Sequence, residues 1–221
     1  MGAGNVGTHL ARNFQRAGHQ ILCIYSRSEL PARRLAEEVG SLGTCRKGEI
    51  PEEADYYLLA LPDSAIADAV DRGQHCRGTW LHTSGAVPLK VFSGLPHPSG
   101  VLYPLQTFTR QREVRISEVP FLVEGSDPET TRNIKILAQS LSSRVHEIDS
   151  ERRLFIHMAA VFANNFSNHM IYIAQDLMAR GGHDAKLLDP LLRETMEKIL
   201  EMGAAGAQTG PALRGDRGTM D

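Results

Sequence analysis

Residues 2–7 of the chain read GAGNVG, and this stretch carries the pattern G-x-G-x-x-G at the start of a helical segment. In this pattern the first glycine, Gly2, permits a tight turn, and Gly4 lets the backbone approach a pyrophosphate. The third, Gly7, lets the helix pack closely on a sheet. Asn5 and Val6 then open the helix, whose free N–H groups attract phosphates. The same pattern also occurs in purely structural turns, so the dinucleotide interpretation depends on its surroundings.

Strands and helices alternate after this turn. A helix is expected at 5–17, and helical patterns recur at about 30–39 and 65–70, while apolar runs at 21–25, 56–61 and 79–82 are typical of buried strands. Later strands are expected at 101–103, 121–123 and 145–148, with a helix at about 128–141 capped by Asp127. This rhythm predicts an α/β fold with a parallel sheet of Rossmann type. Only Met1 precedes the glycines, so we expect the first strand to be missing from this chain.

The sequence changes character near Asp149. Residues 151–180 contain no proline and predict one long helix, and an apolar stripe at about 185–202 predicts a second. We therefore divide the chain into a dinucleotide-binding domain at 1–148 and an all-α domain at 149–221.

Composition excludes several classes of function. Among 221 residues the net charge is -2, so no overall basic field favours nucleic acid. The longest apolar runs are too short to cross a membrane. The three cysteines are scattered and form no CxxC pair, so neither a metal site nor a disulfide framework is predicted, and a reducing cytoplasm is expected.

The preferred dinucleotide follows from the residues after the second expected strand. NAD-binding sites usually place Asp or Glu there to hold the ribose 2′-hydroxyl, but this chain has Ser26, Arg27 and Ser28. The serines can donate hydrogen bonds, and the guanidinium can pair with a 2′-phosphate. We therefore predict NADP. The alternative is an ordinary surface arginine between two helix-capping serines.

Two further strand ends are candidate cofactor contacts, because ligands lie beyond the carboxyl ends of parallel strands. Leu61 and Pro62 can line a ribose, and Ser84 and Gly85 can face the nicotinamide. Helix capping by the two residues after Pro62 and a plain turn at Gly85 are the structural alternatives.

The long helix carries an unusual polar set. His157, Asn164 and Asn168 share one helical face, and Asn165 lies beside Asn168. Because asparagine is a poor residue for helix interiors, these side chains either bind a substrate or form a polar face toward solvent or another subunit. The loop at 208–216 offers Thr209, Gly210 and Arg214 as further substrate contacts, against the alternative of a frayed tail.

Together these segments resemble a known family. The resemblance rests on GAGNVG at 2–7, YSRS at 25–28, HTSG at 82–85, LYPLQTF at 102–108, HMAAVFANNFSNHM at 157–170 and AQTGPALRGD at 207–216. These motifs resemble Rossmann-like proteins with a domain of unknown function numbered 2520, often described as NADP oxidoreductases of the coenzyme-F420-dependent type.

The resemblance implies a helical domain similar to that of 6-phosphogluconate dehydrogenase relatives, with nicotinamide and a small substrate in a cleft between the domains. It implies that His157, Asn165 and the loop at 208–216 lie in that cleft, and pairing through the helical domain predicts a homodimer. His157 is the candidate proton donor, because imidazole titrates near neutral pH, and Asn165 would orient the substrate oxygen. Relatives continue beyond residue 221, so the helical domain is expected to be truncated. The lysine that several relatives use is absent from the long helix. A non-catalytic NADP(H)-binding sensor or assembly protein is therefore the alternative to hydride transfer between nicotinamide and substrate.

The cofactor prediction is testable by substitution. In the variants Arg27→Ala and Ser26→Ala, the ratio of NADPH to NADH affinity measured by calorimetry should fall, because both side chains are assigned to the 2′-phosphate. An unchanged ratio in both variants would show that these residues are surface and capping groups.

Overall fold

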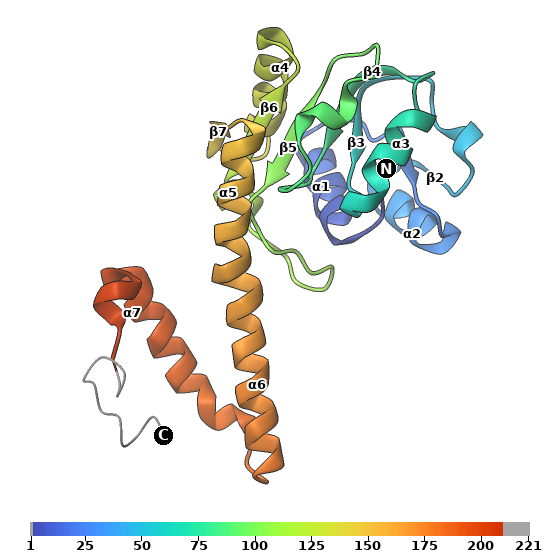
Figure 1. Ribbon diagram of the computed structural model, residues 1–221. Coiled ribbons are helices and arrows are strands. Elements are labelled where there is room, and N and C mark those ends of the chain that lie inside the picture. The colour runs from blue at the N-terminus through green and yellow to red at the C-terminus, as the bar shows by residue number, and fades with distance from the viewer. Residues whose placement is uncertain (1, 210–221) are drawn as a thin grey trace. The chain divides into compact units, whose positions relative to one another are not determined.

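The computed structural model describes residues 2–209 and divides the chain into two compact units, Met1–Phe162 and Ala163–Asp221 (Figure 1). We describe each unit by itself. The domain boundary expected at Asp149 from sequence character lies at the start of a helix that belongs to the first unit.

The first unit has an α/β architecture with parallel-dominated sheets. A two-stranded parallel sheet pairs β1 (Cys23–Tyr25) with β2 (Leu42–Thr44), and a five-stranded sheet has the order β3-β4-β5-β6-β7. Its strands are β3 (Glu53–Leu59), β4 (Arg77–His82), β5 (Ser99–Pro104), β6 (Phe121–Gly125) and β7 (Val145–Glu147). The pair β5 and β6 is antiparallel and the other neighbours are parallel. The Rossmann-type fold expected from the sequence is thus confirmed, with β6 and β7 running opposite to β3, β4 and β5.

Helices cover both faces of the large sheet (Figure 1). The helices of the first unit are α1 (Asn5–Arg16), α2 (Glu29–Val39), α3 (Ile66–Arg72), α4 (Pro128–Gln139) and α5 (Ser150–Ala160), with short 3-10 turns η1 (Lys47–Glu49), η2 (Asp63–Ala65), η3 (Leu89–Phe92) and η4 (Ile116–Glu118). Successive side chains of β4 point to opposite faces of the sheet and so belong to two different hydrophobic cores. Leu81 packs with Leu10 and Phe14 of α1 and with α4, whereas Trp80 packs with Ile66 of α3.

Helix ends bear out some capping predictions and not others. The side chain of Asp127 accepts a hydrogen bond from the Thr130 N–H at 2.8 Å, as expected for an N-cap. Ser28 precedes α2, but its side chain makes no capping hydrogen bond. The alternative that this serine serves to cap a helix is therefore wrong. The side chains after Pro62 also cap no helix.

The two sheets of the first unit face each other across an open slot. Among the described residues, β1 pairs only with β2, and β3 only with β4. Between their facing edges lies a cavity of about 740 Å³, lined mainly by residues 19–25 and 53–58. The N–H of Gly2 donates to the Tyr25 carbonyl at 2.7 Å, so the chain enters the glycine turn beside β1. The slot lies where the strand preceding the glycines belongs in this fold.

A buried ion pair attaches α5 to the large sheet. The guanidinium of Arg153, which is 0% exposed, pairs with the Glu124 carboxylate on β6 and donates to the Val87 carbonyl at 2.7 Å. Ser150 donates to Glu124 at 2.8 Å and accepts a bond from the Leu89 N–H at 2.9 Å. These bonds fix the first turn of α5 against β6 and the loop after β4.

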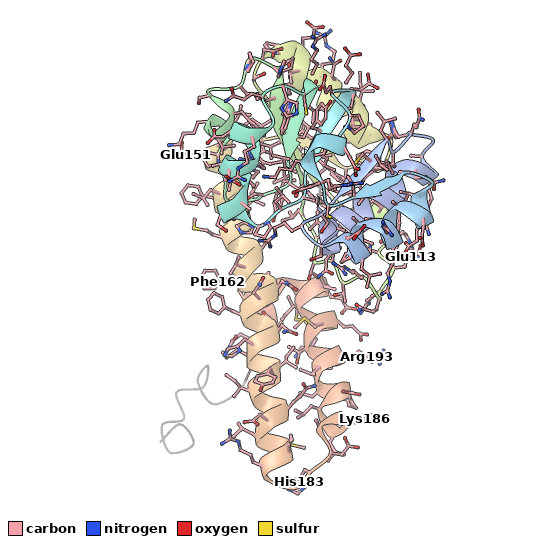
Figure 2. All side chains as sticks on the ribbon, turned by 90° about the vertical axis from the view of Figure 1, so that its right-hand side faces the viewer. Glu113, Glu151, Phe162, His183, Lys186 and Arg193 are labelled. Carbon is pink, nitrogen blue, oxygen red and sulfur yellow. The ribbon has the colours of Figure 1, made fainter. Side chains whose placement is uncertain are left out.

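The helix that starts at Ser150 continues through a π-helical turn, η5 (Val161–Phe166), into α6 (Ser167–Arg180). The sequence predicted the long helix but not this π-helical turn. The prediction that His157, Asn164 and Asn168 share one face assumed 3.6 residues per turn throughout, and a π-helical turn contains more residues than that. Figure 2 shows the side chain of Phe162, the last residue of the first unit, projecting from the helix.

The second unit contains the rest of α6, η6 (Ala185–Leu188) and α7 (Asp189–Ala207), which is interrupted at Gly203 by a non-helical φ of 76°. None of its described residues is buried. No helix in residues 2–209 is long and apolar enough to cross a membrane.

The ion pair gives a stability prediction. Arg153→Met should lower the free energy of unfolding by about 3–5 kcal/mol, because it leaves the Glu124 carboxylate without its partner. The double variant Arg153→Met, Glu124→Gln should recover part of this loss, since no charge is then left unpaired. Urea denaturation measures both. Arg152→Met is the matched control, because Arg152 is exposed on the same helix. If Arg153→Met unfolds at the wild-type urea concentration, the pair does not hold α5.

Candidate functional site

The glycine turn places backbone against backbone at the ends of β1 and β3. A Cβ at Gly2, where φ is 99°, would lie 2.1 Å from the Ala60 carbonyl oxygen, and one at Gly7 would lie 2.0 Å from the Gly2 carbonyl oxygen. Neither position tolerates a side chain. A Cβ at Gly4 would meet nothing within 4 Å. Gly4 therefore faces open space, as expected of the glycine that lets a phosphate approach.

The N-terminus of α1 is left open by its own sequence. Gly4 is the N-cap and supplies no capping side chain, and the first turn contains no acidic residue. The backbone N–H groups of Asn5, Val6 and Gly7 precede the first intrahelical bond, which Thr8 donates to the Gly4 carbonyl at 2.9 Å. These three N–H groups and the partial positive charge of the helix end suit a phosphate.

A cavity of about 510 Å³ adjoins this turn and gathers residues from separate segments. It brings together the sequence-predicted residues Gly2, Gly4, Ser26, Arg27, Ser28, Leu61 and Pro62. It is also lined by three basic side chains that were not expected from the sequence, Lys47, Arg72 and Arg110. Arg72 is paired with Asp68 at 2.7 Å. No carboxylate stands at 26–28, so the arrangement suits the phosphorylated ribose of NADP.

The loop after β4 is held in place by a buried histidine. Nδ1 of His82 accepts a hydrogen bond from the Ser84 N–H at 3.2 Å, and burial, followed by the charge of Arg153, lowers the pKa of His82 to about 3. The imidazole is therefore neutral near pH 7 and can accept this bond. The Ser84 hydroxyl oxygen accepts bonds from the N–H groups of Ala86 and Val87. The loop at Ser84 and Gly85 therefore forms the plain turn that was the structural alternative for these residues. Such a turn can also lie beside a cofactor.

A tyrosine and a histidine meet next to this loop. The hydroxyl of Tyr103 on β5 lies 3.0 Å from Nδ1 of His157 on α5, and a Cβ on Gly85 would lie 2.5 Å from the same nitrogen. Burial raises the pKa of the Tyr103 hydroxyl, partly offset by Arg153, so it remains a protonated donor at neutral pH. His157 and Gly85 were expected from the sequence, whereas Tyr103 was not. Its only signal was a place inside the LYPLQTF motif.

The remaining predicted residues lie in the second unit or outside the described residues. Asn164 and Asn165 lie in the π-helical turn, where the Asn164 amide donates to the Asn165 side-chain oxygen at 3.3 Å. Asn168 and Thr209 are exposed. Gly210 and Arg214 lie outside the described residues. Their expected roles toward a substrate stay predictions.

Known proteins share the sequence and the fold of this chain. The sequence profile described as "NADP oxidoreductase coenzyme F420-dependent" matches residues 1–79, and that of the domain of unknown function 2520 matches residues 119–221. A solved structure from Bacteroides fragilis, provisionally described as an NADP oxidoreductase, is 39% identical, with a TM-score of 0.91, and the match covers 99% of this chain and 85% of that one. The chain belongs to this NADP oxidoreductase family. NADP is the family's cofactor, and the residues around the glycine turn suit it.

Other solved structures extend the comparison. A Thermotoga maritima protein is 26% identical over 99% of this chain and 86% of its own, with a TM-score of 0.79. A reductive aminase from Aspergillus terreus, solved with NADPH, is 17% identical over 90% of this chain and 72% of its own, with a TM-score of 0.65, and shares the fold. No curated protein sequence matches the chain. Within residues 2–209 no group of three or more His, Cys, Asp or Glu side chains is placed to hold a metal ion.

The open space at Gly4 separates the ligand-binding interpretation of the turn from the structural one. Gly4→Ala should leave the Tm of the free protein unchanged, because the added methyl meets no protein atom, but should weaken NADPH binding about tenfold or more by occupying the path of the pyrophosphate. Calorimetry and thermal denaturation give the two readouts. Gly94→Ala, which also adds a methyl in open space but outside the cavity, is the control. Wild-type NADPH affinity in Gly4→Ala would indicate a structural turn.

Proposed function

We propose that this protein is an NADP-dependent reductase that transfers hydride between nicotinamide and a small carbonyl or imine substrate. The observation that carries the proposal is the Tyr103–His157 pair beside Gly85. The pair lies past the carboxyl end of β4, and the glycine turn lies past the carboxyl end of β3, its parallel neighbour. Ligands of open α/β sheets bind along such an edge.

When bound, NADPH supplies the hydride, and the protein must supply a proton to the substrate oxygen or nitrogen. His157 is the proposed proton donor. If the Tyr103 hydroxyl donates to Nδ1, the neutral imidazole carries its proton on Nε2, which becomes the donating atom. The raised pKa of Tyr103 keeps that hydroxyl protonated, so the tyrosine fixes the tautomer and orientation of the ring. As Nε2 gives its proton to the substrate, Nδ1 takes the proton of the Tyr103 hydroxyl, so the ring stays neutral and the phenolate left on Tyr103 is then reprotonated from solvent.

The substrate class is proposed from chemistry and from the fold. Reductases of C=N bonds, named as an imine reductase, a reductive aminase and a pyrroline-5-carboxylate reductase, share this fold at 14–17% identity. Hydride addition to C=N or C=O creates negative charge on nitrogen or oxygen, which a neighbouring acid must neutralise. The Tyr103–His157 pair is suited to either bond.

Substrate contacts from the second unit belong to the same proposal. Asn165 would orient the reacting oxygen or nitrogen, with Asn164, Asn168, Thr209, Gly210 and Arg214 as further contacts. The support is the resemblance together with the π-helical turn that holds Asn164 and Asn165, because such turns are frequent at functional sites.

We also propose that the protein is a homodimer in the cytoplasm. The support is the second unit, where large apolar side chains such as Leu177, Leu191 and Leu200 are more than 60% exposed and none of the described residues is buried. An apolar surface of this kind marks an interaction site, and a second copy is the proposed partner.

A non-catalytic NADP(H)-binding sensor or assembly protein is the second candidate function. It is favoured by the absence of lysine from 150–180, because several relatives of this fold place a lysine in the corresponding helix. The two candidates share cofactor binding and differ in turnover.

Turnover therefore decides between them. With NADPH and a panel of cyclic imines, aldehydes and ketones, we expect NADPH oxidation by the wild-type protein, followed at 340 nm. His157→Gln should lower the rate about 100-fold, as expected for loss of a general acid, with NADPH affinity unchanged. Tyr103→Phe, which removes only the hydroxyl, should lower the rate less and shift its pH profile. Tight NADPH binding without oxidation by any compound would support the sensor, and full activity in His157→Gln would exclude it as the acid.

A further inference from the structure

The residues from Leu105 to Arg115 form a long loop between β5 and η4 whose contacts converge on α1. The ring of Phe108, which is 7% exposed, packs on the ring of His9 with centroids 4.8 Å apart. His9 also bonds through Nε2 to the Thr109 carbonyl at 3.0 Å. The loop is therefore attached to the buried side of α1 immediately before Arg110.

A second attachment follows on the other side of Arg110. Glu113, labelled in Figure 2, pairs with Arg16 in the last turn of α1 at 2.6 Å. Between the two attachments the Arg112 N–H bonds back to the Thr109 carbonyl at 3.1 Å, which closes a tight turn around Arg110. The position of Arg110 is thus set by contacts on both sides in the sequence.

Arg110 reaches from this turn to the glycine motif. One guanidinium N–H donates to the carbonyl of Ala3, which lies between Gly2 and Gly4. The side chain lines the same cavity of about 510 Å³ as these glycines, and the residue is otherwise exposed. One of its five N–H donors is engaged with Ala3, and the guanidinium keeps donors for a ligand in that cavity.

The groups around this position suit an anion. A helix N-terminus carries a partial positive charge, and α1 has no acidic residue in its first turn and no capping side chain to offset it. A fixed guanidinium beside it adds charge of the same sign. The Glu113 carboxylate of the same loop does not neutralise this positive charge, because it is paired with Arg16 at the far end of α1. Two negative phosphates between the helix end and the guanidinium would satisfy both.

We propose that Arg110 is a clamp that holds the cofactor pyrophosphate against the N-terminus of α1. The inference rests on the proposed NADP binding and adds a residue that is 107 positions from Ala3 of the glycine motif. It also assigns different phosphate groups of the cofactor to two basic residues of the cavity. Arg110 recognises the pyrophosphate shared by NADP and NAD, whereas Arg27 recognises the 2′-phosphate that only NADP carries.

The test uses the full chain and four dinucleotide or fragment probes: NADPH, NADH, 2′,5′-ADP and inorganic pyrophosphate. Arg110→Gln removes the charge at similar length, and Arg110→Lys keeps the charge but loses the planar fork. Arg112→Gln is the matched control, because this exposed arginine lies on the same loop and does not line the cavity. Binding is measured by calorimetry, and each variant is checked by its Tm without ligand.

Arg110→Gln should weaken NADPH and NADH by a similar factor, about tenfold or more, so that their affinity ratio is unchanged. The effect on 2′,5′-ADP should be smaller, since that probe lacks the second phosphate of the bridge. Arg110→Lys should be intermediate and Arg112→Gln should match the wild type. The Tm of the free Arg110→Gln protein should not fall, because a like charge leaves the helix end, while the rise in Tm on adding NADPH should shrink.

Three results overturn the proposal. Wild-type affinity for both dinucleotides in Arg110→Gln removes Arg110 from the site while leaving NADP binding intact. A loss confined to NADPH and 2′,5′-ADP assigns Arg110 to the 2′-phosphate instead. A wild-type protein that binds neither dinucleotide overturns the proposed function, and the clamp with it.

Discussion

The close backbone approach at the glycine turn is the constraint on which the site depends. Gly2 donates to the Tyr25 carbonyl at 2.7 Å, and the missing side chains of Gly2 and Gly7 let the turn contact Ala60 and the helix contact the turn. Three chain segments therefore meet within van der Waals distance at the ends of β1 and β3. This contact fixes the start of α1, and its open N–H groups become the centre around which the cavity residues collect.

A second anchor acts at β6, three strands from β3 in the large sheet. The Arg153–Glu124 pair is buried and hydrogen-bonded through Ser150 and Val87, so the first turn of α5 is held against β6. His157 lies one turn further along the same helix face, which brings its ring to Tyr103 and Gly85. The charge of Arg153 also reaches His82 and Tyr103, where it opposes protonation of the imidazole and partly offsets the effect of burial on the phenol. Arg153 thus both anchors α5 and shifts the pKa values of His82 and Tyr103.

Most of the fold could be predicted because its signals are local. The glycine spacing, the β-branched runs and the Asp127-Pro128 helix start each depend on neighbours within a few residues, and the corresponding elements were observed at these places. The strand β2 was missed because its three residues, Leu42–Thr44, carry too little apolar periodicity. The reversed direction of β6 and β7 was not predicted either, because strand direction depends on the path of the connecting loop, and the loop at 105–115 before β6 carries no regular pattern.

By itself the sequence determined the Rossmann-type glycine turn, the strand ends that border the cofactor cavity and the absence of a carboxylate at 26–28, because each is a property of adjacent residues. Only the tertiary structure decided which distant side chains meet there. Arg110 reaches Ala3 across a separation of 107 residues, and Tyr103 reaches His157 across 54. Such pairs leave no trace in local spacing, since they form through loop paths and buried anchors that the whole domain sets when it packs.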